Sequence, residues 1–162
     1  MPDVNAFPAI FLVIAGPPGR VLERSPMRIA ALDVGDARIG VAICDELGLT
    51  TRGLGVVKRQ GGVRDLEAIV RMLAPWEPAR VVVGLPLNMD GSEGPQAARV
   101  RRFGARFADH AKMPIDFWDE RLTTVEAEDL LRAQGIHKQK RRALVDQVAA
   151  AAILRSYLAG RS

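Results

Sequence analysis

The sequence predicts an α/β domain in which helices flank a mixed sheet of five strands. Two observations carry this prediction. Three apolar runs of strand type follow one another before the first helical pattern, and two further strand-like runs then alternate with helical patterns. Successive strands followed by strands separated by helices fit a layered α/β architecture with a mixed sheet.

The predicted strands are bounded by turn signals and differ in pattern. In residues 38–44, large apolar residues alternate with small ones, and a hairpin-like connection at Gly35 links this strand to the one before it. The run ARVVVGLPL is continuously apolar, which is typical of a strand buried on both faces. The five strands are expected at residues 28–33, 38–44 and 53–58, in ARVVVGLPL and in PIDFWDE.

The helical segments have apolar residues at helical spacing and recognisable ends. The first contains the i, i+3, i+4, i+7 series from Leu66 and ends at the prolines that follow it. The second begins at Pro95. A capping box at residues 123–126 starts a third helix, which stops at Gly135. The fourth, from about residue 140 to 158, contains VAAAAIL and is apolar nearly all round, so we expect it to pack on the sheet.

Composition divides the chain into an extension and one domain. Residues 27–162 are expected to form a single globular domain, and residues 1–26 a flexible N-terminal extension, with an added edge strand at residues 9–15 as the alternative. The stretch FPAIFLVIAG is too short to span a bilayer, and no basic residues precede it as they do in a secretory signal. We therefore expect no membrane partner.

Cysteine usage and charge indicate a compartment and a class of partner. The single cysteine, Cys44, excludes an internal disulfide and suits a cytoplasmic protein; its place in an apolar strand indicates a core residue. The chain has 23 Lys and Arg against 19 Asp and Glu, with a net charge of +4. This excess favours an anionic partner, with nucleic acid as the leading candidate and a solvated basic surface as the alternative.

Acidic residues occur where predicted strands end. Asp33 ends the first strand, Asp119 and Glu120 end the fifth, and Asp146 is the one acid on the apolar fourth helix. Taken singly, each acid has a structural explanation: a turn or cap residue, or an ion pair between Asp146 and Arg142 one turn earlier. Together they bring negative charges to one end of the sheet, and divalent cations commonly neutralise such a group.

Four motifs occur along the chain in the order LDVGDARIGVAICD, VVVGLPLNMDGSEGPQA, DERLTTVEAEDLL and KQKRRALVDQVAAAAILRSYL. Together they closely resemble the YqgF family, also called RuvX, of Holliday-junction-resolvase-like proteins with a ribonuclease-H-like fold. The resemblance covers residues 28–158 and implies that residues 27–162 are a ribonuclease-H-like nuclease domain. One departure stands out. Members usually carry Thr and a basic residue after D-x-G, whereas this chain has Asp36 and Ala37, which implies a weaker phosphate contact or a further acid near the metals.

The resemblance implies a metal-dependent endonuclease whose catalytic, metal-binding acids are Asp33, Glu120 and Asp146. Such acids support two-metal phosphodiester hydrolysis, with ions about 3.5–4 Å apart, in which Asp33 would bridge the ions. An all-oxygen ligand set indicates Mg²⁺ or Mn²⁺. Two implied substrates stay open: the precursor of 16S ribosomal RNA, and branched DNA such as a Holliday junction. Cleaving a symmetric junction would further imply a homodimer.

Residues expected to contact the nucleic acid are basic or lie in the glycine-rich loop GLPLNMDGSEG. A stripe of arginines runs along the second helix, and the basic run HKQKRR precedes the helix that carries Asp146. Arg121 could orient the neighbouring Glu120 or contact the cleaved strand. The alternatives are a flexible connection for the loop and a solvated face for the basic run. The full set is Arg38, Asn88, Arg99, Arg102, Arg106, Arg121, Lys138, Lys140, Arg141 and Arg142.

Two other functional classes compete with the nuclease. Sugar kinases and actin-like ATPases also hold phosphate with a D-x-G hairpin, but they need a second lobe that this chain is too short to supply. A non-catalytic RNA-binding factor in ribosome assembly would keep the fold and the positive charge. Aromatic residues make up only 5% of the chain, so base stacking is not an evident way for such a factor to bind RNA.

Overall fold

The computed structural model describes residues 27–121 and 138–161, without the side chains of residues 138–143. Three sequence predictions lie outside these residues: the extension at 1–26, the helix that starts at residues 123–126, and the side-chain roles of Lys138, Lys140, Arg141 and Arg142. In the described part, no helix is long and apolar enough to cross a membrane.

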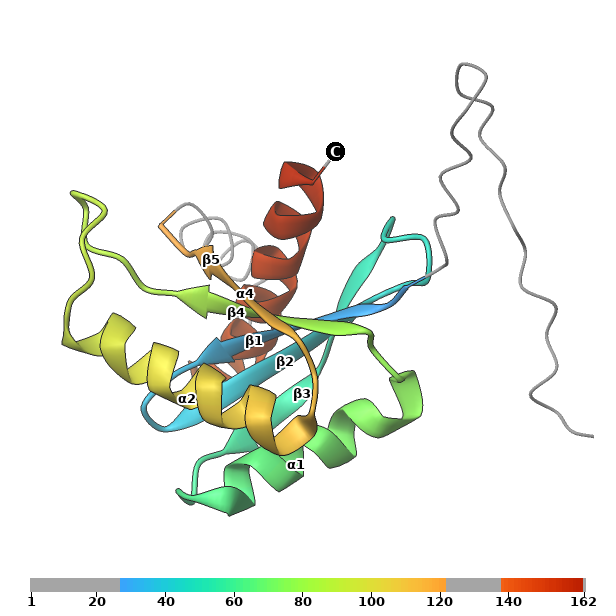
Figure 1. Cartoon of the computed structure of the whole chain (residues 1–162), viewed down its shortest axis with the longest axis horizontal. Coiled ribbons are helices and arrows are strands. Elements are labelled where there is room, and N and C mark those ends of the chain that lie inside the picture. The colour runs from blue at the N-terminus through green and yellow to red at the C-terminus, as the bar shows by residue number, and fades with distance from the viewer. Residues whose placement is uncertain (1–26, 122–137, 162) are drawn as a thin grey trace, which may run out of the picture.

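Five strands form one mixed sheet in the order β3-β2-β1-β4-β5 (Figure 1). The strand β1 pairs antiparallel with β2 and parallel with β4, β2 pairs antiparallel with β3, and β4 pairs parallel with β5. This sheet confirms the predicted architecture, and the first strands shift by no more than two residues from their predicted bounds. The strands are β1 (Ile29–Val34), β2 (Arg38–Cys44), β3 (Thr51–Lys58), β4 (Arg80–Leu85) and β5 (Ile115–Asp119).

Helices cover both faces of the sheet. Figure 1 shows α1 and α2 on one face and α4 on the other. The short 3₁₀ helix η1 follows α1, where two nearby prolines remove backbone donors and end the α-helix. These elements are α1 (Val63–Leu73), η1 (Ala74–Trp76), α2 (Pro95–Ala111) and α4 (Lys138–Gly160).

The alternation of side chains along β1 assigns each residue to one of two cores. Leu32 and Val34 pack with α1 and α2 in the larger core, whereas Ile29 and Ala31 pack with α4 in a smaller one. Successive side chains in a strand point to opposite faces, so Asp33 belongs to the α4 face. The same core contains Cys44, whose prediction as a buried residue is confirmed.

A glycine in β2 lets α4 lie close against the sheet. A Cβ atom at Gly40 would overlap the backbone of Asp146, with the carbonyl carbon only 2.6 Å away. Gly40 pairs directly with Asp33 in the β1–β2 ladder. The missing side chain at this position therefore brings the α4 segment that carries Asp146 to the end of β1.

Candidate active site

Three acids from separate elements meet at the carboxyl end of β1. Asp33 is the penultimate residue of β1, Glu120 follows β5 directly, and Asp146 lies on α4. A side-chain hydrogen bond joins Asp33 to Glu120, and the charge of Asp146 acts on Asp33. The structure thus places Asp33 within electrostatic range of both other acids of the set that the resemblance implies.

The sheet itself positions Glu120. Its backbone N–H donates to the carbonyl oxygen of Leu85 at 3.1 Å, which extends the β4–β5 pairing by one residue. Gly84 makes room for the side chain: a Cβ atom there would overlap the Glu120 carboxylate and lie 2.5 Å from Cδ1 of Ile153. Sequence reasoning missed Gly40 and Gly84, although an isolated glycine within a strand is a signal of close approach.

Burial and neighbouring negative charge favour the protonated forms of Asp33 and Glu120. Burial raises the pKa of Glu120 to about 8, and the charge of Asp33 and a hydrogen bond to it add to this effect. Burial also raises the pKa of Asp33 to about 6; the hydrogen bond from Glu120 opposes this rise, and the charge of Asp146 contributes to it. At neutral pH, these effects favour a protonated Glu120, whose O–H donates a hydrogen bond to the Asp33 carboxylate.

Arg38 balances the third acid. Its Nε donates to Oδ2 of Asp146 at 2.6 Å, and the exposed fractions of the two side chains are 36% and 21%. The structure therefore pairs Asp146 with an arginine from β2, at a position expected to bind nucleic acid. The side chain of Arg142, the other partner considered for Asp146, is outside the described residues.

The donor chemistry of this cluster fits a hard divalent cation. Within residues 27–121 and 138–161, no group of three His, Cys, Asp or Glu side chains has the arrangement of a formed metal site. The three carboxylates nevertheless supply only oxygen ligands. The pKa values of Asp33 and Glu120 are raised first by burial and then by neighbouring negative charge, and a bound cation would favour the charged forms. The residues that would hold it are Asp33, Glu120 and Asp146.

Arg121 serves a different acid from the one expected. Its guanidinium binds Asp119, with Nη2 2.6 Å and Nε 2.8 Å from Oδ2, and its Nη1 lies 3.4 Å from the carbonyl oxygen of Met89. The prediction that Arg121 orients Glu120 is therefore corrected: Arg121 links the end of β5 to the β4–α2 loop. Asp119, in turn, accepts the backbone N–H of Arg121 at 3.0 Å.

Asn88 lies in the β4–α2 loop with its amide already engaged. Its Nδ2 donates to Oγ of Ser92 at 2.9 Å, and its backbone N–H donates to the Ser92 carbonyl at the same distance. Asp90 also accepts the backbone N–H of Ser92. These bonds fold the loop onto itself, and Ser92 accepts from one of the two N–H donors of the Asn88 amide.

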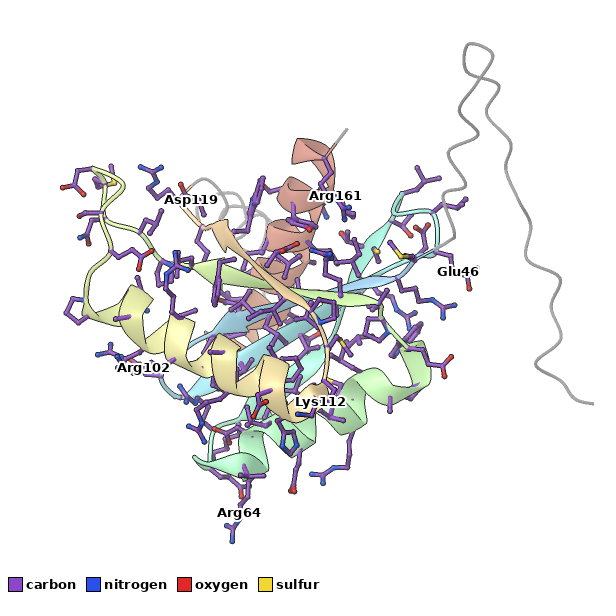
Figure 2. All side chains as sticks on the ribbon, viewed as in Figure 1. Glu46, Arg64, Arg102, Lys112, Asp119 and Arg161 are labelled. Atoms are coloured by element: carbon purple, nitrogen blue, oxygen red, sulfur yellow. The ribbon has the colours of Figure 1, made fainter. Side chains whose placement is uncertain are left out.

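The arginine stripe of α2 lies on the sheet face opposite the acid cluster. Arg99, Arg102 and Arg106 are exposed, as predicted, while Phe103 and Phe107 point into the core. Figure 2 labels Arg102 on the outer surface of α2. Oδ1 of Asp36, a bend residue of the turn, lies 3.8 Å from Nη2 of Arg99.

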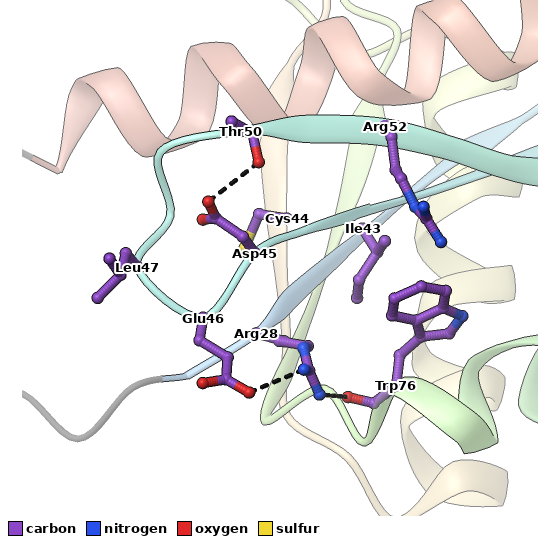
Figure 3. Close-up of a pocket in the computed structure, with 9 residues that line it drawn as sticks. All are labelled: Arg28, Ile43, Cys44, Asp45, Glu46, Leu47, Thr50, Arg52 and Trp76. Atoms are coloured by element: carbon purple, nitrogen blue, oxygen red, sulfur yellow. Dashed lines mark hydrogen bonds and ion pairs between the residues drawn. The ribbon is translucent and has the colours of Figure 1, made fainter. Parts of the chain in front are cut away.

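A hollow of about 420 Å³ lies at the opposite end of the sheet from Asp33 (Figure 3). Arg28 spans it, donating to Oε1 of Glu46 at 2.8 Å and to the carbonyl oxygen of Trp76 at 3.2 Å. The guanidinium of Arg52 stacks on the Trp76 ring at 4.3 Å. The charged side chains around this hollow are thus engaged with one another or with Trp76, and they hold the β2–β3 turn against η1.

Comparison with solved structures defines the fold. *Thermus thermophilus* RuvC in complex with a Holliday junction substrate matches with a TM-score of 0.52 and 21% identity, over 83% of this chain and 96% of RuvC. The fowlpox virus resolvase, solved in complex with Holliday junction DNA, matches with a TM-score of 0.53 and 14% identity, over 83% and 99%. The chain therefore has the ribonuclease-H-like fold of RuvC-like resolvases.

Sequence comparison defines the family. The model of the family described as "RuvX: Holliday junction resolvase" matches residues 27–160, and the chain belongs to this family of nucleases. A relative from *Syntrophus aciditrophicus* is 46% identical over 132 residues, which cover 82% of this chain and 88% of the relative. One from *Anaeromyxobacter* sp. is 47% identical over 135 residues, covering 83% and 98%. Both are named "Putative pre-16S rRNA nuclease". The resemblance drawn from the motifs is confirmed.

Proposed function

We propose that this chain is a divalent-metal-dependent endonuclease that hydrolyses the backbone of structured nucleic acid at the cluster of Asp33, Glu120 and Asp146. The carrying observation is that Asp33, in β1, and Glu120, directly after β5, share a side-chain hydrogen bond and both have raised pKa values. Holding two acids together in this way costs free energy of folding. A cation site gives that arrangement a function.

Each acid has a separate part in the proposed mechanism. Mg²⁺ or Mn²⁺ ions bound here would activate the attacking water and stabilise the leaving oxygen. Asp33 lies between the other two acids in the electrostatic network, so it is proposed as the shared ligand. Glu120 must lose its proton before it can hold a cation, so cleavage should increase as the pH rises toward about 8. In the metal-free protein, Arg38 neutralises the Asp146 carboxylate.

Two substrates fit this proposal, the 16S ribosomal RNA precursor and the four-way DNA junction. The names of the relatives favour the first, and the family description favours the second. The exposed arginines of α2 suit backbone phosphates, which both substrates present. We place this activity in the cytoplasm, where the ribosomal precursor would be met.

A paired cleavage assay tests the proposal. Equal amounts of junction and precursor RNA are incubated with wild-type protein, in Mn²⁺ or in chelator, and product formation is followed. We expect metal-dependent cleavage of at least one substrate and none by Asp33→Asn. Asp109→Asn, which removes an exposed charge at the far end of α2, is the matched control and should cleave normally. Binding of both substrates without cleavage would instead establish a non-catalytic RNA-binding protein.

Paired cleavage of a junction would also require two active sites. A four-way junction is symmetric, and two nicks at equivalent positions need two chains related by a two-fold axis. We therefore propose a homodimer on junction DNA. Sedimentation of the complex in chelator should give two chains per junction; one chain per junction, with paired nicks in Mn²⁺, would contradict the dimer.

A further inference from the structure

A hollow of about 250 Å³ lies between α2, the β1–β2 turn and the segment after β3, on the sheet face opposite Asp33. Its floor is apolar, formed in part by Val34, Val100 and Phe103. Four arginines from two separate segments surround this floor: Arg59, Arg99, Arg102 and Arg106. Sequence reasoning found the three on α2 but neither the hollow nor Arg59.

Arg59 is held rigidly at one side of the hollow. Its Nη1 donates to the carbonyl oxygen of Gly35 at 3.0 Å, and its Nε donates to Oδ2 of the buried Asp65 at 3.3 Å. Its guanidinium also lies over the Phe103 ring, 5.4 Å from the centroid. These contacts fix the position of the charge before any ligand arrives, so binding would cost little side-chain entropy.

The charges of the other three arginines are largely not neutralised by acidic side chains of the described residues. Among the described residues, Arg102 and Arg106 make no hydrogen bond or ion pair, and Arg99 has only the long contact of 3.8 Å with Asp36. Asp36 is the one acid in the lining, and its side chain is 79% exposed. Guanidinium groups gathered around one apolar floor repel one another, and an anion bound among them would offset that repulsion.

We propose that this hollow binds a backbone phosphate of the nucleic acid, at a distance from the bond that is cleaved. This inference rests on the proposed function for the identity of the anion. Because Val34 and Asp33 are neighbours in β1 but point to opposite faces, the substrate must pass around the β1–β2 turn to reach both the hollow and the acids. A bent or branched substrate satisfies this geometry, and the hollow serves as its anchor.

The test measures binding in chelator, so that cleavage does not enter. A fluorescent four-way DNA junction and a fluorescent precursor RNA hairpin are titrated with wild-type protein and with Arg102→Ala/Arg106→Ala at several salt concentrations. Arg71→Ala/Arg155→Ala removes the same charge from exposed positions on α1 and α4 and is the matched control. Circular dichroism melting confirms that each variant is folded.

We expect the Arg102/Arg106 variant to bind at least one probe about tenfold or more weakly, with a salt slope reduced by about 1, because the neutralisation of one backbone phosphate is lost. The control variant should change neither quantity as much. Asp36→Asn should change affinity in the opposite direction, since it removes the negative charge from the lining. Equal losses in the two arginine variants, or no binding of either probe by the wild type, would overturn the anchor. The nuclease proposal fails separately, by the absence of metal-dependent cleavage.

Discussion

Asp33 and Asp65 are two shielded carboxylates with opposite surroundings. Asp65, 1% exposed, receives hydrogen bonds from the backbone N–H groups of Gln60 and Gly61 and from Arg59. Burial alone would raise the pKa of Asp65, but these donors outweigh it and hold the pKa below its usual range. Asp33 is half-buried and faces other acids, and its pKa is raised to about 6.

The comparison separates a structural acid from the acid that we propose as functional. Each donor around Asp65 stabilises its charged form, so ionisation of Asp65 stabilises the fold. The neighbours of Asp33 include Glu120 and Asp146, so ionisation of Asp33 destabilises the fold until a cation binds. The residue type is the same in both cases, and the surrounding groups decide what the carboxylate does.

The largest expected effect is on catalysis by Asp33→Asn. This change keeps the size of the side chain but removes the charge, so metal-dependent cleavage should fall by about 10²-fold or more, since several kcal/mol of transition-state stabilisation are lost. Single-turnover cleavage of the preferred substrate measures the effect. A cleavage rate within twofold of wild type would mean that Asp33, like Asp65, is not needed for catalysis.

Asp65→Asn should have the opposite signature. Three donors would face an amide in place of a carboxylate, and we expect the free energy of unfolding to decrease by about 1–3 kcal/mol. Cleavage per folded molecule should stay close to wild type, because Asp65 lies on the other face of the sheet. Urea denaturation beside the cleavage assay measures both quantities; a stable but inactive Asp65→Asn would contradict the structural assignment.

The pH dependence of stability sharpens the comparison. In the unfolded chain, Asp33 and Glu120 ionise near their ordinary pKa values of 3.8 and 4.5, whereas in the fold these pKa values are about 6 and about 8. The folded state therefore binds more protons between about pH 4 and pH 8, and the metal-free protein should lose stability as the pH rises through this window. Asp65 acts in the other direction, since its stabilising effect is lost only as the pH falls below about 4.

Thermal melting in chelator checks this sign. The melting temperature should decrease between pH 5 and pH 8 by about 2–4 °C for each kcal/mol of lost stability. The double variant Asp33→Asn/Glu120→Gln removes both raised carboxyls and should show a flatter profile. A wild-type profile that rises over the same range would mean that the two acids are stabilised in their charged forms.

The smallest expected effect concerns Arg38, which neutralises Asp146 as Arg59 neutralises Asp65. Arg38→Gln frees the Asp146 carboxylate, so the Mn²⁺ concentration at half-saturation should decrease, by about fivefold at most for a partly exposed pair. Calorimetric titration with Mn²⁺ measures the shift. An increase in this concentration would show instead that Arg38 positions Asp146 for the metal.

Within the described residues, the sequence was sufficient for the strands and helices, and it named the acids that we propose as the site. Strict periodicity identified the strands and helices, and the position of Asp33 and Glu120 at strand ends marked them as candidates. Asp146 was recognisable as a lone acid on an apolar helix. These are local signals, each contained within a few residues.

The sequence was not sufficient for the partners of these side chains. Arg38 and Asp146 are separated by 108 positions, and their pairing depends on the close approach of α4 that Gly40 allows. Asp65 gave no signal, because its partners include backbone N–H groups that every sequence contains. The hollow beside Arg59 also arises only when three distant segments fold together.

Thermal melting with and without Mn²⁺ at pH 7.5, in the absence of nucleic acid, tests the central claim most directly. The account predicts that Mn²⁺ raises the melting temperature of wild-type protein and of Asp65→Asn, because a ligand that binds only the folded state stabilises it. It predicts no such increase for Asp33→Asn. An equal increase for Asp33→Asn and wild type, or no increase for wild-type protein at millimolar Mn²⁺, would contradict the assignment of the Asp33 cluster as the metal site.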